Sequence, residues 1–348
     1  MAIIPRVEER ELPLVIRASG EDAGARDVGA LCQWLKQEAS QVQAWLMKHG
    51  AILFRGFAVE GPEDFERIAR AVDPELKNEY LGTSPRDALT DYVFSASELP
   101  DYYPIPQHCE MSFCAEPPRR VFFCCLEAPA EGSGETPLCD FRNVWRDLDP
   151  AVKQRFEAGG LRIVRNYGPP GQNGNDAMQL KGWDAMFLTR DRAAVEEKCR
   201  EQHFEPTWLE GDGLRLVHSQ PVSRGHPVTG ETVWHNHLTT FHRSTGVDEY
   251  ERIVALRPTD RHRGLLKLAR DLEEKAAAKG PEEQSMHVTY LDGSEIPRED
   301  VAHVRDVVWR HLVPTPWEQG DVIAIDNHST SHGRLPYEGP RQVAVCWA

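Results

Sequence analysis

Two stretches of the sequence indicate how this chain folds. They are Gln107-His108-Cys109-Glu110-Met111 and Asp326-Asn327-His328-Ser329-Thr330-Ser331-His332-Gly333-Arg334. A His-x-Glu pair with one remote histidine is the ligand set of a facial triad, which holds a metal and leaves coordination positions open for chemistry. The two stretches lie more than 200 residues apart. A triad built from them requires a fold that pairs distant segments, as a β-rich fold does.

The spacing of His108 and Glu110 has a geometric reason. Successive side chains of a strand point to opposite faces, so residues two apart face the same way. A short strand here would present an imidazole and a carboxylate to one ion. A His-x-Glu pair also arises by chance in a chain with 14 histidines. In that case His108 is an ordinary surface or supporting histidine, so the pair alone does not establish a metal site.

Composition excludes several classes of protein. The chain has 348 residues and a formal net charge of -15, with a sequence pI near 5.4. Nucleic-acid binding draws much of its affinity from cationic contacts with phosphates, so a nucleic-acid partner is not expected. We find no apolar run of the roughly 18 residues that would span a bilayer, and no secretory signal at the N-terminus. We therefore expect a cytoplasmic protein without a membrane partner.

The cysteines predict a reducing compartment. None of the eight forms a C-x-x-C pair, and Cys124 and Cys125 lie within the apolar run Val121–Leu126. Adjacent strand residues point to opposite faces, so these two are small packed side chains on two sides of a sheet. We expect reduced thiols.

Hydrophobic periodicity and turn residues predict strands spread along the chain with helices among them. Strands are expected at 51–54, 121–126, 136–140, 161–166, 287–291, 322–325 and 342–347, with 214–220 and 233–234 paired around a turn at 225–231. Helices are expected at 28–48 (ended by Gly50), from Pro62, at 144–148, 152–156, 248–279 and 301–311, and mainly at 185–210. This pattern favours a mainly β fold with inserted helices, a double-stranded β-helix (jelly roll, cupin-like) core. Without repeats or linkers, we expect one domain over 1–348 with a helical insert at about 244–280.

Arg341 is a candidate for binding a carboxylate. It follows the turn Gly339-Pro340 and, as part of the last strand, would share a face with Val343 and Val345. A guanidinium offers a planar fork that suits a dicarboxylate chelating the metal. The alternative is an arginine that pairs with a surface glutamate.

The ordered set of motifs resembles the iron(II)/2-oxoglutarate dioxygenases of the taurine dioxygenase (TauD/TfdA-like) family. It is most similar to their branch of amino-acid hydroxylases of the syringomycin-biosynthesis type. The resemblance covers about residue 40 to the C-terminus and rests on Leu53–Phe57, Gly82–Arg86, His108–Phe113, Gly134–Pro137, His226–Glu231 with Trp234 and Asn236, Asp292-Gly293, and Gly320–Arg341.

The resemblance implies that His108, Glu110 and His332 bind Fe(II), and that Arg341 pairs with the C5 carboxylate of the co-substrate 2-oxoglutarate. Thr136 would donate its hydroxyl to the same carboxylate. Arg334 competes with Arg341 for this role, although a salt bridge in the turn region is the preferred interpretation of Arg334. We interpret His328, four residues before His332, as a residue outside the ligand set.

In the family, O2 and 2-oxoglutarate oxidise a C–H bond, with release of succinate and CO2. Glu110 favours hydroxylation, since a glycine or alanine there is typical of halogenases. We expect an oxidoreductase that acts on a small-molecule substrate, an amino acid or related small carboxylate, in natural-product biosynthesis or catabolism. The substrate is free or tethered to an acyl or peptidyl carrier protein. Candidate polar contacts to it are Asn78, Arg86, Arg165, His235 and Asn236.

Parts of the sequence are also compatible with other functions. Desaturation, cyclisation or epoxidation could follow from the same chemistry. A zinc deaminase would need a downstream Pro-Cys-x-x-Cys, which the sequence lacks. A zinc hydrolase would leave Arg341 and Thr136 unexplained, and a non-catalytic metal-binding cupin-like protein would keep the fold without turnover. The segment 248–279 is a lid, a carrier-protein dock or, more simply, a solvated helix.

Overall fold

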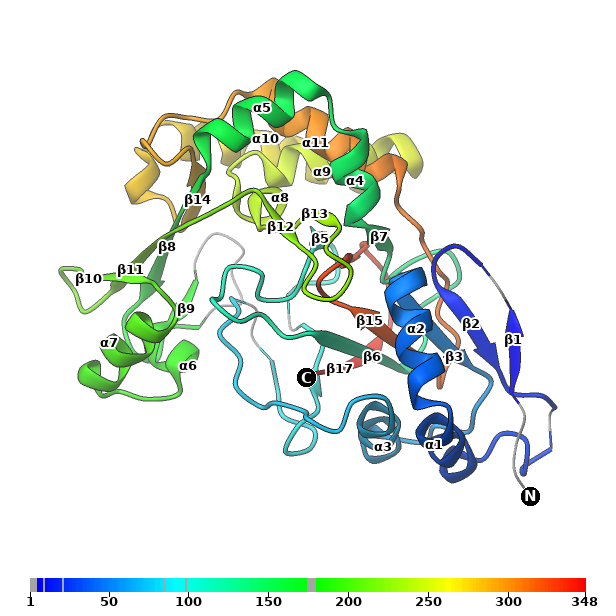
Figure 1. Ribbon diagram of the computed structural model, residues 1–348. Coiled ribbons are helices and arrows are strands. Elements are labelled where there is room, and N and C mark those ends of the chain that lie inside the picture. The colour runs from blue at the N-terminus through cyan, green and yellow to red at the C-terminus, as the bar shows by residue number, and fades with distance from the viewer. Residues whose placement is uncertain (1–4, 9, 21, 84–85, 98, 174–179) are drawn as a thin grey trace.

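A computed structural model of the protein describes residues 5–8, 10–20, 22–83, 86–97, 99–173 and 180–348 (Figure 1). Ser84 and Pro85 of the Gly82–Arg86 motif lie outside the described residues. Within these ranges, every helix is too short or too polar to cross a membrane.

The largest sheet has seven strands in the order β1-β2-β3-β15-β6-β17-β4. The pairs are antiparallel except β2 with β3, which is parallel. The strands are β1 Arg6–Glu8, β2 Leu14–Arg17, β3 Ala51–Arg55, β15 Val322–Asp326, β6 Arg120–Glu127, β17 Gln342–Trp347 and β4 Phe94–Ser95. The predicted strands at 51–54, 121–126, 322–325 and 342–347 are confirmed, and they lie side by side at the centre of this sheet.

Strand β6 is buried on both faces and separates two hydrophobic clusters. Val121, Phe123 and Cys125 pack into one cluster, and Phe122 and Cys124 pack into the other. The prediction that the two adjacent cysteines face opposite ways is confirmed. All eight cysteines are buried and free.

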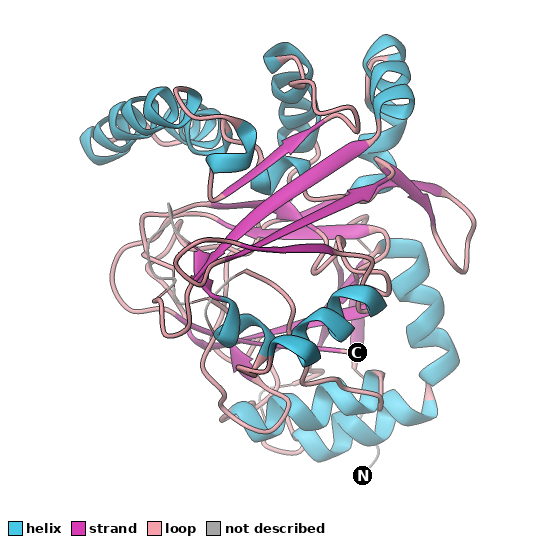
Figure 2. Ribbon diagram, turned by 90° about the vertical axis from the view of Figure 1, so that its left-hand side faces the viewer, coloured by secondary structure: helices cyan, strands magenta, loops and turns pink. Residues whose placement is uncertain are grey.

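Three helices cover the outer face of the seven-stranded sheet: α1 Val28–Gln37, α2 Ala39–His49 and α3 Pro62–Val72 (Figures 1 and 2). The prediction of one helix over 28–48 is wrong, because the chain breaks at Glu38. Buried positions continue across the break, from Leu35 to Val42, so the apolar spacing carries no sign of it. Gly50 ends α2 as predicted, with φ at 74°. A Cβ there would lie 2.0 Å from Thr330 Oγ1, which reserves the position for glycine.

A three-stranded antiparallel sheet, β5-β16-β7, brings the two decisive stretches together. Its strands are β5 Ile105–His108, β16 Thr330–Arg334 and β7 Leu138–Asp140. The strand predicted at 136–140 is therefore shorter, and Thr136 precedes it.

A further sheet, in the order β10-β11-β8-β14, lies beside this region, and β9 runs parallel to β8. Its strands are β10 Glu205–Trp208, β11 Leu214–Gln220, β8 Leu161–Gly168, β14 Met286–Thr289 and β9 Leu180–Gly182. Two predictions are wrong here. Residues 205–208 form a strand instead of continuing a helix, and 214–220 pairs with β8 and β10 instead of 233–234. The hairpin at the predicted turn joins β12 Ser223–Gly225 to β13 Thr232–Trp234, because Ser223 to Gly225 supply the nearer partner.

Most of the remaining helices gather at the top of the molecule in Figure 1, whereas α6 and α7 lie at the lower left beside β9 and β10. The remaining helices are α4 Phe141–Asp147, α5 Pro150–Gly159, α6 Trp183–Phe187, α7 Arg192–Glu201, α8 Leu238–Phe241, α9 Thr245–Leu256, α10 Asp260–Ala277, the 3-10 turn Pro281–Glu283 and α11 Arg298–Arg310. The predicted exposed insert divides into two parts, since α9 buries Val247, Tyr250 and Ile253 but α10 buries only Ala269. The described chain is thus rich in sheet with inserted helices, as predicted. A single domain remains a prediction.

Candidate active site

His108 and His332 face each other across the β5–β16 pair. Their Cα atoms are register partners, and their ring centroids lie 4.5 Å apart. Both side chains are buried. The sheet therefore sets the separation of two imidazoles that the sequence separates by more than 200 residues.

Glu110 lies close to this pair, but it lies in a turn and not in the predicted strand. Strand β5 ends at His108, and Glu110 lies in the turn that follows. The strand alternation that was expected to align residues 108 and 110 does not apply, because Met111 takes a φ of 50° and the chain turns. Glu110 Oε2 lies 3.6 Å from His332 Nε2. One ligand atom from each of His108, Glu110 and His332 lies within 4.8 Å of the other two.

The protonation states of these groups suit a divalent cation. Pro106 O accepts a 2.8 Å hydrogen bond from His108 Nδ1, which leaves the Nε2 lone pair available. Burial and the neighbouring His332 lower the pKa of His108 to about 4, so this ring is neutral near pH 7. Burial alone would raise the pKa of Glu110, but Arg86 and the two imidazoles outweigh it and hold that pKa well below its usual value.

The donor set fits Fe(II). Two imidazoles and one carboxylate form the facial arrangement that non-haem iron uses with open positions, whereas structural zinc sites are usually closed by four protein ligands. His328 lies outside the group, next to His226 and His235 at ring-centroid distances of 5.8 and 6.1 Å.

Arg341 and Thr136 lie together near the start of β17. Arg341 Nη2 donates to Thr136 Oγ1 at 3.2 Å, and its Nε donates to Gly134 O at 2.9 Å. Arg341 precedes β17, and a register shift lies between Gln342 and Val343. The prediction that Arg341 shares a strand face with Val343 is therefore wrong. No carboxylate within the described part of the chain forms an ion pair with Arg341. Burial lowers its pKa to about 10, and the guanidinium remains charged at neutral pH.

Arg334 is already held by the backbone. Its guanidinium donates to the carbonyl oxygens of Leu99, Pro100 and Tyr103 at 2.6 to 3.0 Å. The predicted salt bridge does not form among the described residues, because these three carbonyls take its donors. Arg334 therefore fixes the loop before β5 and has fewer donors left for a ligand than Arg341.

The five candidate substrate contacts have different surroundings. Arg86 pairs with Glu110 at 3.0 Å, and Arg165 stacks on Phe113. Asn236 stabilises its own loop by bonding Val222 O and the Leu238 N–H. His235 is buried near His328, and Asn78 is exposed at a separate surface pocket.

Two supporting residues were not singled out by the sequence. Asn327 bonds the backbone of Glu110, and His237 lies edge-on to His108 at 5.3 Å between ring centroids. Asn327 lies within the stretch 326–334, but nothing in its spacing indicates that its partner is Glu110. His237 has no sequence signal beyond being a histidine.

A second group of His242, His287 and Glu295 also has ligand atoms within 4.8 Å of one another. Its chemistry suits a metal less well. His287 Nδ1 accepts from the Arg243 N–H, and its Nε2 lies 3.0 Å from Glu295. Since both ring nitrogens are engaged, His287 has no lone pair free for an ion.

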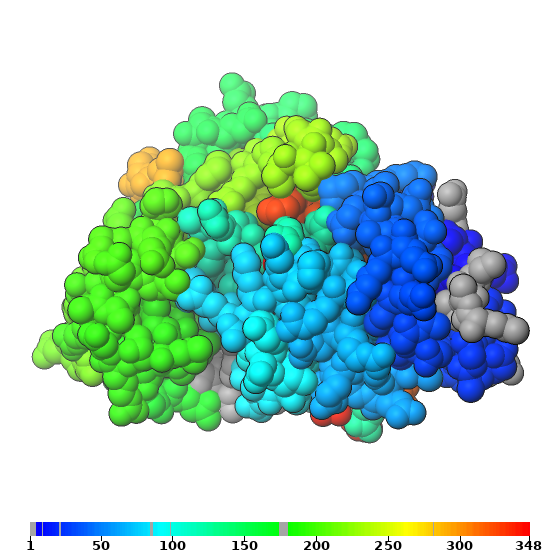
Figure 3. Space-filling model, turned by 60° about the horizontal axis from the view of Figure 1, so that its bottom comes forward, coloured from blue at the N-terminus to red at the C-terminus, as the bar shows by residue number. Residues whose placement is uncertain are grey.

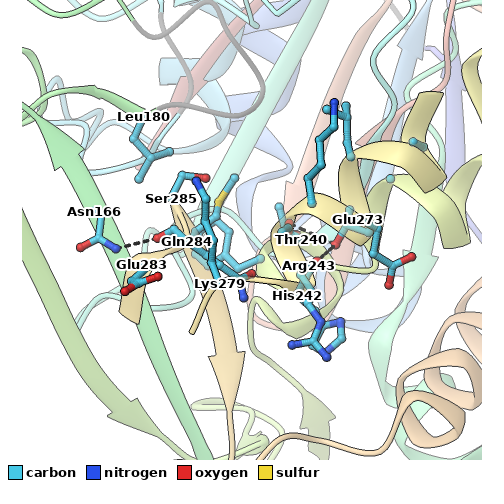
Figure 4. A pocket seen from close by; sticks show the side chains of 18 of the residues that line it. Asn166, Leu180, Thr240, His242, Arg243, Glu273, Lys279, Glu283, Gln284 and Ser285 are labelled. Atoms are coloured by element: carbon cyan, nitrogen blue, oxygen red, sulfur yellow. Dashed lines mark hydrogen bonds between the residues drawn. The ribbon is translucent and has the colours of Figure 1, made fainter. Parts of the chain in front are cut away.

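The cavity of about 1000 Å³ beside α10 does not open on the triad. Figure 4 shows its lining, with Asn166 from β8, Thr240 and His242 near α8, and Lys279 after α10. Phe241 lines it and packs on His237, with 4.8 Å between ring centroids. His237 in turn contacts His108, with 5.3 Å between their ring centroids. On another face, orange-red atoms of the C-terminal segment lie at the bottom of a hollow beside the blue N-terminal helices (Figure 3).

Comparison with known proteins gives consistent matches. The dapdiamide synthesis protein DdaC of Enterobacter agglomerans is 29% identical over 300 residues, covering 86% of this chain and 82% of that protein. A clavaminate synthase-like protein of Arabidopsis thaliana is 29% identical over 316 residues, covering 89% and 85%. The crystal structure of PvcB from Pseudomonas aeruginosa has a TM-score of 0.52 at 14% identity, covering 99% of this chain and 90% of that one, which shows a shared fold.

The family described as "Taurine catabolism dioxygenase TauD, TfdA family" matches residues 15–347. This range includes both decisive stretches and nearly all described elements. The chain therefore belongs to the TauD/TfdA family and is an Fe(II)- and 2-oxoglutarate-dependent dioxygenase that uses O2.

Proposed function

We propose that this enzyme hydroxylates an unactivated C–H bond of an amino acid or a related small carboxylate, with Fe(II) held by His108, Glu110 and His332. The observation that carries the proposal is the approach of these three buried side chains to within 4.8 Å of one another. A C–H compound, 2-oxoglutarate and O2 give the alcohol, succinate and CO2. When bound, Fe(II) supplies the activation of O2 for this oxidation.

Arg341 and Thr136 would hold the C5 carboxylate of 2-oxoglutarate. A guanidinium and a hydroxyl within 3.2 Å of each other can donate to the two oxygens of one carboxylate. The partly buried charge of Arg341 lacks a carboxylate partner among the described residues, so an incoming dicarboxylate would neutralise it. Trp317 Nε1, which donates to Thr136 Oγ1 at 3.3 Å, holds the hydroxyl in place.

The surroundings of the triad support its chemistry. Arg86 keeps Glu110 ionised through their 3.0 Å ion pair. The ring of Phe123 lies 4.7 Å from that of His332, and the ring of Phe113 lies 4.8 Å from that of His237. These rings place apolar surface beside His332 and beside His237.

The relatives favour a role in natural-product chemistry. DdaC takes part in dapdiamide synthesis by its name, and an analogous biosynthetic step is the context that we propose here. We also propose that the strands form a double-stranded β-helix within a single domain. A substrate tethered to a carrier protein is one form to be tested.

The test has two stages. Anaerobic addition of Fe(II) and 2-oxoglutarate should produce a visible charge-transfer band. With O2, an amino acid from a panel that includes carrier-bound forms should then increase succinate release, and the product should gain one oxygen by mass. A folded protein that shows no band would contradict the proposal. A product that has lost two hydrogens would instead indicate desaturation or cyclisation.

A further inference from the structure

Lys181, on β9, is a buried cation whose charge is not neutralised by any carboxylate among the described residues. The side chain is 8% exposed, and its Nζ lies 5.4 Å from the ring centroid of Tyr80. No hydrogen bond or ion pair joins its ammonium to the part of the chain that the structure describes. A buried charge without a partner is costly, so the position suits a ligand that brings an opposite charge.

Arg86 connects Lys181 to the triad. Its guanidinium lies over the same Tyr80 ring at 4.4 Å, and its Nη2 donates to Tyr80 Oη at 3.2 Å and to Glu110 Oε2 at 3.0 Å. Glu110 therefore neutralises Arg86, and no second carboxylate among the described residues pairs with Lys181. Because Lys181 and Arg86 both contact the Tyr80 ring, and Arg86 contacts Glu110, Lys181 lies within the length of a small molecule from Glu110.

The charge of Lys181 persists at neutral pH. Burial, with the nearby charge of Arg86, lowers the pKa of Lys181 to about 8, so most of the amine is protonated at pH 7. In a chain with a formal net charge of -15, this ammonium still has no acidic neighbour in contact among the described residues.

Arg165 is a less suitable anchor. Its guanidinium lies under the rings of Phe113 and Phe204 at 4.2 and 4.7 Å from their centroids, and its Nη1 donates to Tyr167 Oη. Its Nε and Nη2 are fully enclosed, and a ligand reaches them only if those rings move.

We propose that Lys181 binds the carboxylate of the substrate, whose reacting carbon then lies at His108, Glu110 and His332. This inference rests on the proposed function and narrows the substrate to a compound with a free carboxylate. Arg341 contacts Thr136 and Gly134, a different set of residues, so the two cations serve different carboxylates. An aminoacyl group joined to a carrier protein through its carboxylate would leave Lys181 unneutralised.

The test compares free acids with matched uncharged forms. The probes are the proteinogenic L-amino acids, their carboxamides and their N-acetylcysteamine thioesters, assayed by succinate release with Fe(II), 2-oxoglutarate and O2. In the wild type, a free acid should stimulate release, and its carboxamide should need about a 10- to 100-fold higher concentration, as expected when a charged hydrogen bond is lost.

Variants at Lys181 separate binding from folding. Lys181→Met should raise the KM for the free acid by about 10- to 100-fold, leave the KM for the keto-acid co-substrate nearly unchanged, and abolish the difference between acid and carboxamide. Lys181→Arg should restore part of the preference for the acid. Lys267→Met, on the exposed face of α10, is the matched control and should behave as wild type.

Three results would overturn the inference. They are a panel in which no free acid stimulates release, stimulation by thioesters alone, or a Lys181→Met variant that weakens acid and carboxamide equally. In each case the charge-transfer band and basal succinate formation would still support the iron site. If the wild type lacks that band, the proposed iron site itself fails and the inference falls with it.

Discussion

Asn327 and Glu110, 217 residues apart in sequence, exchange two hydrogen bonds. The Glu110 N–H donates to Asn327 Oδ1 at 2.7 Å, and Asn327 Nδ2 donates to Glu110 O at 2.9 Å. The same amide nitrogen donates to Pro118 O at 2.7 Å. One buried side chain thus fixes the turn that carries Glu110 to the strand pair that carries the two histidines.

Replacing this amide should loosen the candidate iron site. In Asn327→Ala, one N–H and two carbonyl groups in the interior lose their partner. We expect a loss of about 2 to 4 kcal/mol in the free energy of unfolding. The concentration of Fe(II) required for half-maximal activity should rise about 10- to 100-fold, as for residues that orient metal ligands. Urea unfolding and an iron titration measure the two effects.

Asn143→Ala provides the control, since Asn143 bonds the exposed Arg146 and its removal should change stability by about 0.5 kcal/mol or less. An Asn327→Ala protein that folds and binds iron as tightly as wild type would show that the turn keeps its shape without the amide.

Removal of any one triad side chain should abolish iron-dependent turnover. His108→Ala and His332→Ala each delete an imidazole, whereas Glu110→Gln keeps the shape of the side chain but removes the charge that pairs with Arg86. We expect succinate formation at background and loss of the charge-transfer band in each variant. His328→Ala, outside the group, should retain both. Retained turnover in His332→Ala would exclude this residue as a ligand.

Local patterns in the sequence predicted most elements, whereas the three triad residues were proposed from the resemblance to the family. The strands β3, β6 and β15 are short apolar runs bounded by turn residues, and such runs indicate strands wherever they occur. The resemblance to the family implied that His108 and His332 lie close together, and the β5–β16 pairing brings them together. The break between α1 and α2 at Glu38 had no such local signal.

What the sequence could not provide depends on contacts between distant segments. The turn at Met111 replaces a strand that alternation predicted, because Asn327 holds the backbone of Glu110 from far along the chain. Lys181 carries no motif, and its place beside the Tyr80 ring follows only from the way β9 packs in three dimensions. Strand partners such as β11 and β8 likewise depend on which edges are free in three dimensions.

Arg341 and Arg334 should respond differently to substitution. Arg341→Ala should raise the KM for the keto-acid co-substrate by about 10-fold or more, because a charged hydrogen-bond partner of the carboxylate is lost. Arg341→Lys should recover part of the affinity, since a single ammonium replaces a planar fork. Arg334→Ala should mainly lower the free energy of unfolding, because three carbonyl groups lose their donor. Equal effects of the two alanine variants on this KM would contradict the assignment.

Acid should destabilise the metal-free protein through its buried histidines. His235 is 1% exposed, and burial, with Arg224 and His328, lowers its pKa to about 3. Its pKa in the unfolded chain is about 6.5, so acidification below that value protonates only the unfolded form. Between pH 7 and pH 5 this linkage costs about 2 kcal/mol of unfolding free energy. His235→Gln should reduce the pH-dependent loss by that amount in urea unfolding, whereas His203→Gln, at an exposed site, should leave it unchanged.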